Sequence, residues 1–165
     1  MLRKILFILL LPFICLTTYA QNGVRVYGFS QESLPGIIPK GTTESGGPVK
    51  KEIVPEYLIY LSSTSAGALP VEVYIKGKPY SIKTTTAVRT PVVQKNNVGK
   101  SVTLVPAATG TVRQLTLTHY TPGKVFSRAK AKARIYDLVV VYRLKGTYYS
   151  ATLKKLTKLE PVFNE

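Results

Sequence analysis

Residues 134–144 read RIYDLVVVYRL, and residues 147–156, TYYSATLKKL, follow them across Lys145-Gly146. Both faces of the segment from Ile135 to Leu144 are largely apolar, which is typical of a strand in the middle of a sheet. The second segment becomes rich in lysine towards its end, as outer strands often do. We therefore expect a hairpin of one central and one outer strand in this part of the chain.

The composition of the remaining chain favours the same class of fold. After residue 20 the sequence contains 18 Val, 16 Thr, 10 Tyr and 7 Ile, which together are 51 of 145 residues. These β-branched and aromatic side chains suit a pleated, half-buried surface, and long helix-forming stretches are missing. The sequence therefore predicts an all-β protein.

Further strands are expected on both sides of a second hairpin. In it, Val71, Val73 and Ile75 share one face, and residues 80–86 resume the alternation after the turn Lys76-Gly77-Lys78-Pro79. The other expected strands cover residues 23–30, 56–62, 91–94, 101–105 and 112–119. Seven to nine short antiparallel strands are typical of an immunoglobulin-like two-sheet β-sandwich, here over residues 56–160, with a small β-barrel as the alternative.

The first twenty residues, MLRKILFILLLPFICLTTYA, have the pattern of a secretory signal peptide. Arg3 and Lys4 precede an apolar run that is too short to span a bilayer comfortably, and Thr18-Tyr19-Ala20 supplies small residues for cleavage before Gln21. We expect the mature chain to be periplasmic, extracellular or at the cell surface, without a transmembrane span. With Arg3 and Lys4 removed, it carries 21 − 8 = +13 formal charges.

Residues 21–55 are expected to form a short strand followed by an arm. From Gln31 to Pro55 four prolines are interspersed with four glycines, so this segment is poorly able to form a core of its own. This arm is either a linker or an extended segment that docks on a partner, with residues 24–29 adding a strand to the partner's sheet. Residues 161–165 are expected to be a tail.

Catalytic and metal-binding residues are scarce. The only cysteine, Cys15, lies in the predicted signal peptide, and the chain contains a single histidine, His119. A cysteine nucleophile, a disulfide scaffold and a multi-histidine metal site are therefore not available to the mature chain. No phosphate-binding glycine motif occurs, and we expect no cofactor.

His119 and Asp137 are the two residues that could support a hydrolase. His119 would have to be the base of a serine site, yet no G-x-S-x-G sequence surrounds a serine, so a strand-end role is favoured. Asp137 interrupts an apolar strand, and we expect a salt bridge to Arg134, Arg143 or a cross-strand lysine. The sequence thus favours a protein without enzymatic activity.

The basic residues give the clearest indication of a binding surface. Residues 127–134 read SRAKAKAR, which on a strand puts Arg128, Lys130, Lys132 and Arg134 on one face and three alanines on the other. On a helix the same spacing would scatter the charges. Three further cations follow near the C-terminus, at Lys154, Lys155 and Lys158. These seven residues are the candidate site for a polyanion or an acidic partner, although edge protection or solvation would produce the same pattern.

Two functions fit these observations. The first is an exported, non-enzymatic accessory or structural subunit of a bacterial cell-envelope assembly, which docks on an envelope protein through sheet edges, tyrosine-rich faces and the basic stripe. The alternative is a basic module that binds a polyanion, which would be lipopolysaccharide, anionic glycan or extracellular DNA, with a lipid headgroup as a further possible partner. Specific recognition of nucleic acid is not favoured, because no recognition helix or RNA-binding aromatic motif is present.

Overall fold

A computed structural model describes residues 23–35, 55–97, 99–119 and 126–164. Within these residues the chain forms eleven strands and one short helix, so the prediction of an all-β fold is confirmed. The elements are β1 (Val24–Pro35), β2 (Pro55–Ser63), β3 (Leu69–Ile75), β4 (Lys78–Val88), β5 (Val92–Lys95), β6 (Ser101–Val105), β7 (Thr111–His119), α1 (Ser127–Lys132), β8 (Leu138–Leu144), β9 (Thr147–Leu153), β10 (Thr157–Lys158) and β11 (Val162–Asn164).

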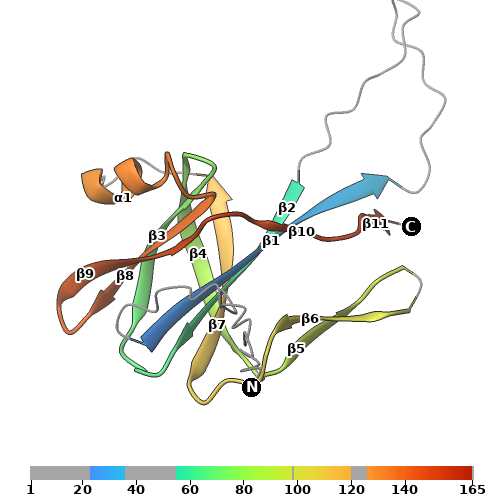
Figure 1. Ribbon diagram of the computed structural model, residues 1–165, viewed down its shortest axis with the longest axis horizontal. Coiled ribbons are helices and arrows are strands. Elements are labelled where there is room, and N and C mark those ends of the chain that lie inside the picture. Colours follow the sequence, from blue (N-terminus) through green and yellow to red (C-terminus); the bar gives the residue numbers. More distant parts are fainter. Residues whose placement is uncertain (1–22, 36–54, 98, 120–125, 165) are drawn as a thin grey trace, which may run out of the picture.

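Nine of the strands belong to one curled sheet that forms a half-barrel (Figure 1). Its order is β10-β1-β2-β7-β4-β3-β8-β9, with β11 beside β1, and β5 and β6 form a separate two-stranded sheet. The structure therefore does not show the two facing sheets of an immunoglobulin-like sandwich. The register shifts within β3 and β4, and such irregularities bend strands, so a single sheet wraps around its own inner face.

Both predicted hairpins are present. Their two-residue turns have positive φ angles at both positions, 48° and 81° at Lys76-Gly77 and 49° and 80° at Lys145-Gly146. This backbone matches the right-handed twist of paired strands, and glycine adopts it without steric cost. The hairpin of β8 and β9 has the predicted arrangement, with β8 inside the sheet and β9 at its end. Its strands are shorter than predicted, because β8 begins at Leu138 and β9 ends at Leu153.

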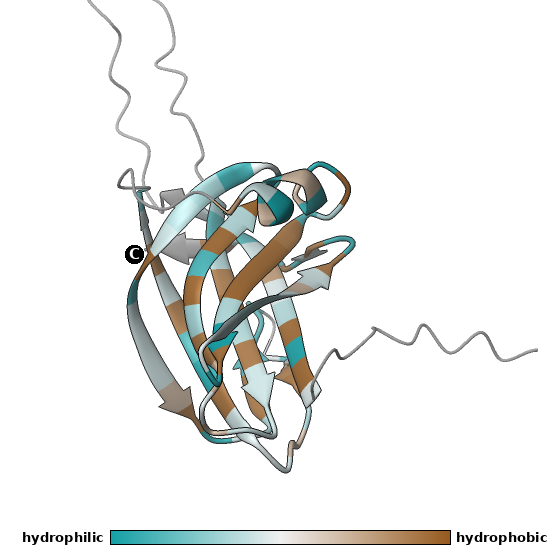
Figure 2. Ribbon diagram, turned by 90° about the vertical axis from the view of Figure 1, so that its left-hand side faces the viewer, coloured by the Kyte–Doolittle hydropathy of each residue, from teal (hydrophilic) through white to brown (hydrophobic). Residues whose placement is uncertain are grey.

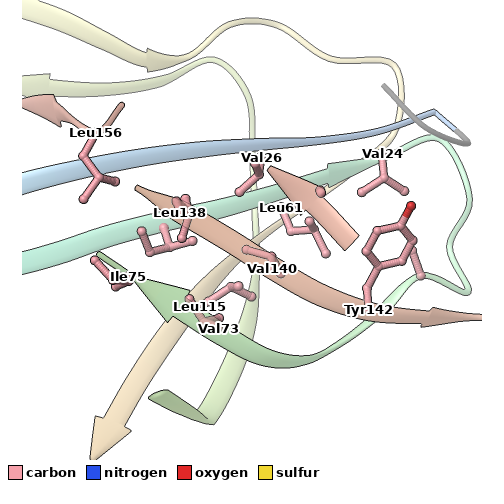
Figure 3. Packing of buried hydrophobic residues seen from close by; sticks show 13 residues of the cluster. Val24, Val26, Leu61, Val73, Ile75, Leu115, Leu138, Val140, Tyr142 and Leu156 are labelled. Carbon is pink, nitrogen blue, oxygen red and sulfur yellow. The ribbon is translucent and has the colours of Figure 1, made fainter. Parts of the chain in front are cut away.

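The main core lies inside the half-barrel. Hydrophobic and hydrophilic residues alternate along the strands (Figure 2), which directs one set of side chains inwards. Figure 3 shows this packing, in which strands from both ends of the sheet contribute. The buried members of the cluster are Val24, Val26, Ile59, Leu61, Ala68, Val73, Ile75, Leu115, Leu138, Val140, Tyr142, Ala151 and Leu156.

Two smaller clusters cover parts of the outer face of the sheet. Phe29, Tyr60 and Val112 pack beneath Leu104 and Val105 of β6. The second cluster lies elsewhere on the outer face, where α1 covers β3 and β8. There the outward-facing side chains of Tyr74, Val139 and Val141 contact Ala129 and Ala133. Because both of its faces are covered, β8 is apolar on both.

Residues 127–132 form the helix α1, so the predicted extended stripe is wrong. Ala129 and Ala133 are four residues apart and therefore share one face of a helix, where both are buried. Ala131 and the charged residues Arg128, Lys130 and Arg134 are exposed. The alternation of alanine with cations thus reflects a small helix that packs closely on the sheet through two of its three alanines.

The predicted arm does not begin at Gln31. Residues 31–35 continue β1 and pair with β2 as far as Glu32 and Pro55, and β11 pairs with β1 in parallel from Ser33. The predicted tail therefore contributes a strand. Residues 36–54 and the predicted signal peptide, residues 1–20, lie outside the described residues.

Candidate functional site

The seven predicted basic site residues fall into three groups in the structure. Arg128, Lys130 and Lys132 belong to α1, where the Lys132 Nζ donates a hydrogen bond to the Ser150 hydroxyl at 2.6 Å. Lys158 lies on β10 and forms an ion pair with Glu32 at 2.7 Å, and this pair links β10 to β1. The remaining three, at positions 134, 154 and 155, are exposed and meet at one end of the half-barrel.

Backbone hydrogen bonds hold three loops together at this end. The Lys76 N–H donates to the Asp137 carbonyl at 2.8 Å, and the Asp137 N–H donates to the Lys154 carbonyl at 3.2 Å. The β3–β4 turn, the segment after α1 and the bend after β9 are therefore neighbours, and Figure 1 shows α1 and the β3–β4 turn at the same end. The five exposed cations of these loops, which we call the basic end, are Lys76, Lys78, Arg134, Lys154 and Lys155.

Lys76 and Lys78 were not among the predicted site residues. In the sequence they signal only a hairpin turn, since they lie some fifty residues before α1. The signal that could have found them is topological. The start of β8 pairs with the end of β3, so the β3–β4 turn must lie beside the segment that precedes β8.

Asp137 has a structural role at the same end. Its Oδ2 accepts a hydrogen bond from the Leu156 N–H at 3.1 Å, so the carboxylate fixes the bend between β9 and β10. This bond takes the place of the predicted salt bridge. The residue precedes β8 rather than interrupting it, because the strand begins at Leu138.

The second candidate site is the open side of the half-barrel, between β1 and β9. Among the described residues, β9 pairs only with β8, and β10 pairs with β1 at Phe29 and Ser30 alone. The first half of β1 and the outer edge of β9 therefore have no ladder with each other, although the two strands lie close together near Gly28 and Leu153. A groove of about 290 Å³ lies along β1 here, and its lining includes residues 25–29, Pro106, Leu153 and Thr157.

The direction of the backbone groups along this groove follows from one hydrogen bond and one turn. The Ser30 carbonyl accepts from the Leu159 N–H at 2.9 Å, on the side away from β2. Backbone groups alternate along a strand, so those of Val26 and Gly28 point to the same side. On β9, Thr147 pairs with Leu144 across the two-residue turn, so the amide of Thr152 points away from β8.

Gly28 lies where the two sides of the half-barrel come closest. A methyl group on its Cα would lie 2.6 Å from the Leu138 Cδ2, 2.7 Å from the Leu156 Cδ2 and 3.3 Å from that of Leu153. These leucines come from β8, the bend and β9. The absence of a side chain at Gly28 therefore allows β1 to approach the other end of the sheet.

His119 is one of the residues that line a cleft between β2 and β7. β2 pairs with β7 only from Ile59 onwards, so residues 55–58 and 116–119 separate and enclose a cleft of about 400 Å³. Tyr57 and Tyr80 meet in it edge to face, with ring centroids 6.0 Å apart, and burial raises the pKa of the Tyr57 hydroxyl, with a smaller contribution from Tyr80. His119 is exposed at the strand end and pairs with Tyr80 across the sheet.

No clear catalytic constellation is seen in the described part of the chain. Within it, no three side chains of His, Cys, Asp or Glu lie close enough to hold a metal ion. Glu72 is the one buried carboxylate there, and its Oε2 accepts a hydrogen bond from the Tyr74 hydroxyl at 3.1 Å. None of the helices in the described ranges has the length and apolar character to cross a bilayer.

Comparison with known proteins gives no further guide. No protein-family model, no curated protein and no solved structure matches this chain. The function must therefore be inferred from the two surfaces described above, the open side of the sheet and the basic end.

Proposed function

We propose that this protein is an exported, non-enzymatic subunit of a bacterial cell-envelope assembly and that it docks on a partner protein by accepting a strand between β1 and β9. The observation that carries the proposal is the groove at the open side of the half-barrel. Export rests on the predicted signal peptide. The basic composition and the scarcity of catalytic residues favour binding over catalysis.

An extended segment of a partner fits this groove chemically. The backbone groups of Val26 and the amide of Gly28 on one side, and the amide of Thr152 on the other, are directed towards the inserted strand. β1 and β9 run in the same direction, because the six strand pairs that connect them are all antiparallel. A strand antiparallel to both would form the more favourable kind of ladder on each side and would complete the barrel.

A proline at position 152 tests this docking mode. Thr152→Pro removes the amide that points out of the sheet and leaves the ladder with β8 intact, whereas Thr152→Ala keeps that amide and removes only the side chain. Residues 21–165 of both variants and of the wild type would be used as bait for detergent-solubilised envelopes at low and high salt. We expect a defined partner to be retained at high salt by the wild type and by Thr152→Ala and to be lost from Thr152→Pro.

Two results would contradict the proposal. A partner retained equally by Thr152→Pro would show that the outer edge of β9 is not used. A broad eluate of polyanions that disappears at high salt, with no defined protein, would favour the alternative function, a module that binds anionic ligands. The circular dichroism of both variants should match that of the wild type, which verifies that the proline does not unfold the sheet.

A further inference from the structure

We infer that the basic end is a docking surface for an anionic lipid bilayer, with Ile135 as the side chain that enters the layer. This inference concerns a different surface from the strand-binding groove and does not depend on it. It is carried by the cations that the three loops bring together and by an apolar side chain among them.

The charge of the basic end is largely uncompensated. The loops contribute five cations, and Asp137 is the acidic residue among them, so the net formal charge of the basic end is +4. The Asp137 carboxylate is also half-buried and accepts from the Leu156 N–H, so it faces the bend rather than solvent. Such a concentration of cations attracts phosphate groups, and the attraction falls with increasing salt.

Ile135 distinguishes a bilayer from other polyanions. Its side chain is 71 % exposed, the highest value among the large apolar side chains of the described residues. It directly follows Arg134 at the end of the helical segment. A glycan or DNA offers phosphate or carboxylate groups but little that would favour burial of an isoleucine. The boundary between headgroups and acyl chains accepts cationic and apolar side chains at once.

The backbone around Ile135 is held in place, so the side chain projects from a rigid base. The Ile135 N–H and the Tyr136 N–H both donate to the Lys132 carbonyl, at 2.9 and 3.0 Å. Tyr136 then packs against the cluster beneath α1. Little conformational entropy of the backbone would therefore be lost when the tip enters a bilayer.

The test is flotation of purified residues 21–165 with vesicles of phosphatidylcholine, alone or mixed with phosphatidylglycerol. We expect the chain to float with the anionic vesicles and not with the neutral ones. Ile135→Ser should lower the affinity by about tenfold, and the double variant Lys154→Gln/Lys155→Gln by about 25-fold, since each cation near the surface contributes about fivefold. Lys76→Asn removes a third cation and should lower the affinity by about fivefold. Asparagine tolerates the positive φ at this position of the turn.

The matched control is Lys95→Gln/Lys100→Gln, which removes two exposed lysines, one at the end of β5 and one directly before β6. It should change the affinity by less than about twofold, because charges beyond the Debye length contribute little. A loss equal to that of the basic-end pair would overturn the inference, because net charge alone would then explain binding. Heparin binding that matches vesicle binding, with Ile135→Ser behaving as wild type in both, would identify a polyanion in solution as the ligand instead.

Discussion

Gly28 is the single residue on which the closure of the half-barrel depends most directly. The methyl group of Gly28→Ala would meet three leucine side chains at 2.6–3.3 Å. The nearest atoms are the ends of flexible side chains, so the protein should fold with a rearranged core at a cost of about 1–3 kcal/mol in the free energy of unfolding. Urea denaturation would measure this loss.

Gly67→Ala is the matched control for that substitution. Its added methyl would lie no closer than 3.9 Å to any neighbour, and no positive φ is required at this position. We expect a stability within about 0.5 kcal/mol of the wild type. Equal losses in both variants would show that the contact with the leucines is not the cause at Gly28, because the lower backbone entropy of the unfolded chain favours alanine at both positions.

Glu72 makes stability depend on pH. The residue is 5 % exposed, and burial raises the pKa of its carboxyl group, although the hydrogen bond from the Tyr74 hydroxyl partly opposes this shift. A raised pKa in the folded state means that the stability from the protonated form is fully present below the unfolded pKa and is lost as the pH rises through the folded pKa. Glu72→Gln stays neutral and can still accept the bond from Tyr74.

The expected result for Glu72→Gln is a gain in stability relative to the wild type that grows from acidic towards neutral pH. The gain should level off above the folded pKa of Glu72. Urea denaturation at a series of pH values would give the difference between the two proteins. A difference that stayed constant across the series would attribute the effect to packing of the amide, and not to ionisation.

At the scale of one element, two substitutions in α1 test whether helical packing explains the positions of its alanines. Ala129 is buried against the sheet and Ala131 is exposed, although both would lie on one face of a strand. Ala129→Lys should destabilise the fold by about 2 kcal/mol or more, because it introduces a charge into a packed contact. Ala131→Lys adds the same charge to the exposed face and should be nearly neutral. Equal losses in thermal unfolding would contradict the helix.

This helix also illustrates what the sequence could not predict. A strict alternation of cations and alanines has the period of a strand, yet alanine favours a helix and small side chains allow close packing on a sheet. Which preference is realised depends on the outward-facing Tyr74, Val139 and Val141, whose need for a cover is visible only in the folded sheet. The strands from β2 to β9 and both hairpin turns were predictable, because their signals are local, whereas β10 and β11 were not predicted.

At the scale of the whole molecule, the same limitation applies to the candidate surfaces. Arg134 was identified from the alternating basic stripe, and Lys154 and Lys155 from the lysines near the C-terminus. The inclusion of Lys76 and Lys78 depends on strand order. The single curled sheet likewise depends on register shifts in β3 and β4 and on β10 joining β1, none of which has a sequence signal of its own. The groove and the basic end are therefore products of topology rather than of any motif.

The open side of the half-barrel makes a prediction about the whole sheet. Alternate amides of β1 face opposite neighbours, so those of Arg25 and Tyr27 are held by β2, and those of Val26 and Gly28 face the groove. Hydrogen exchange followed by NMR should therefore show slow exchange at Arg25 and Tyr27 and much faster exchange at Val26 and Gly28. A partner that inserts a strand should slow exchange at Val26 and Gly28 and leave the other two unchanged. Uniformly slow exchange at all four amides in the isolated chain would mean that the sheet is already closed in solution, and the groove could not then accept a partner strand.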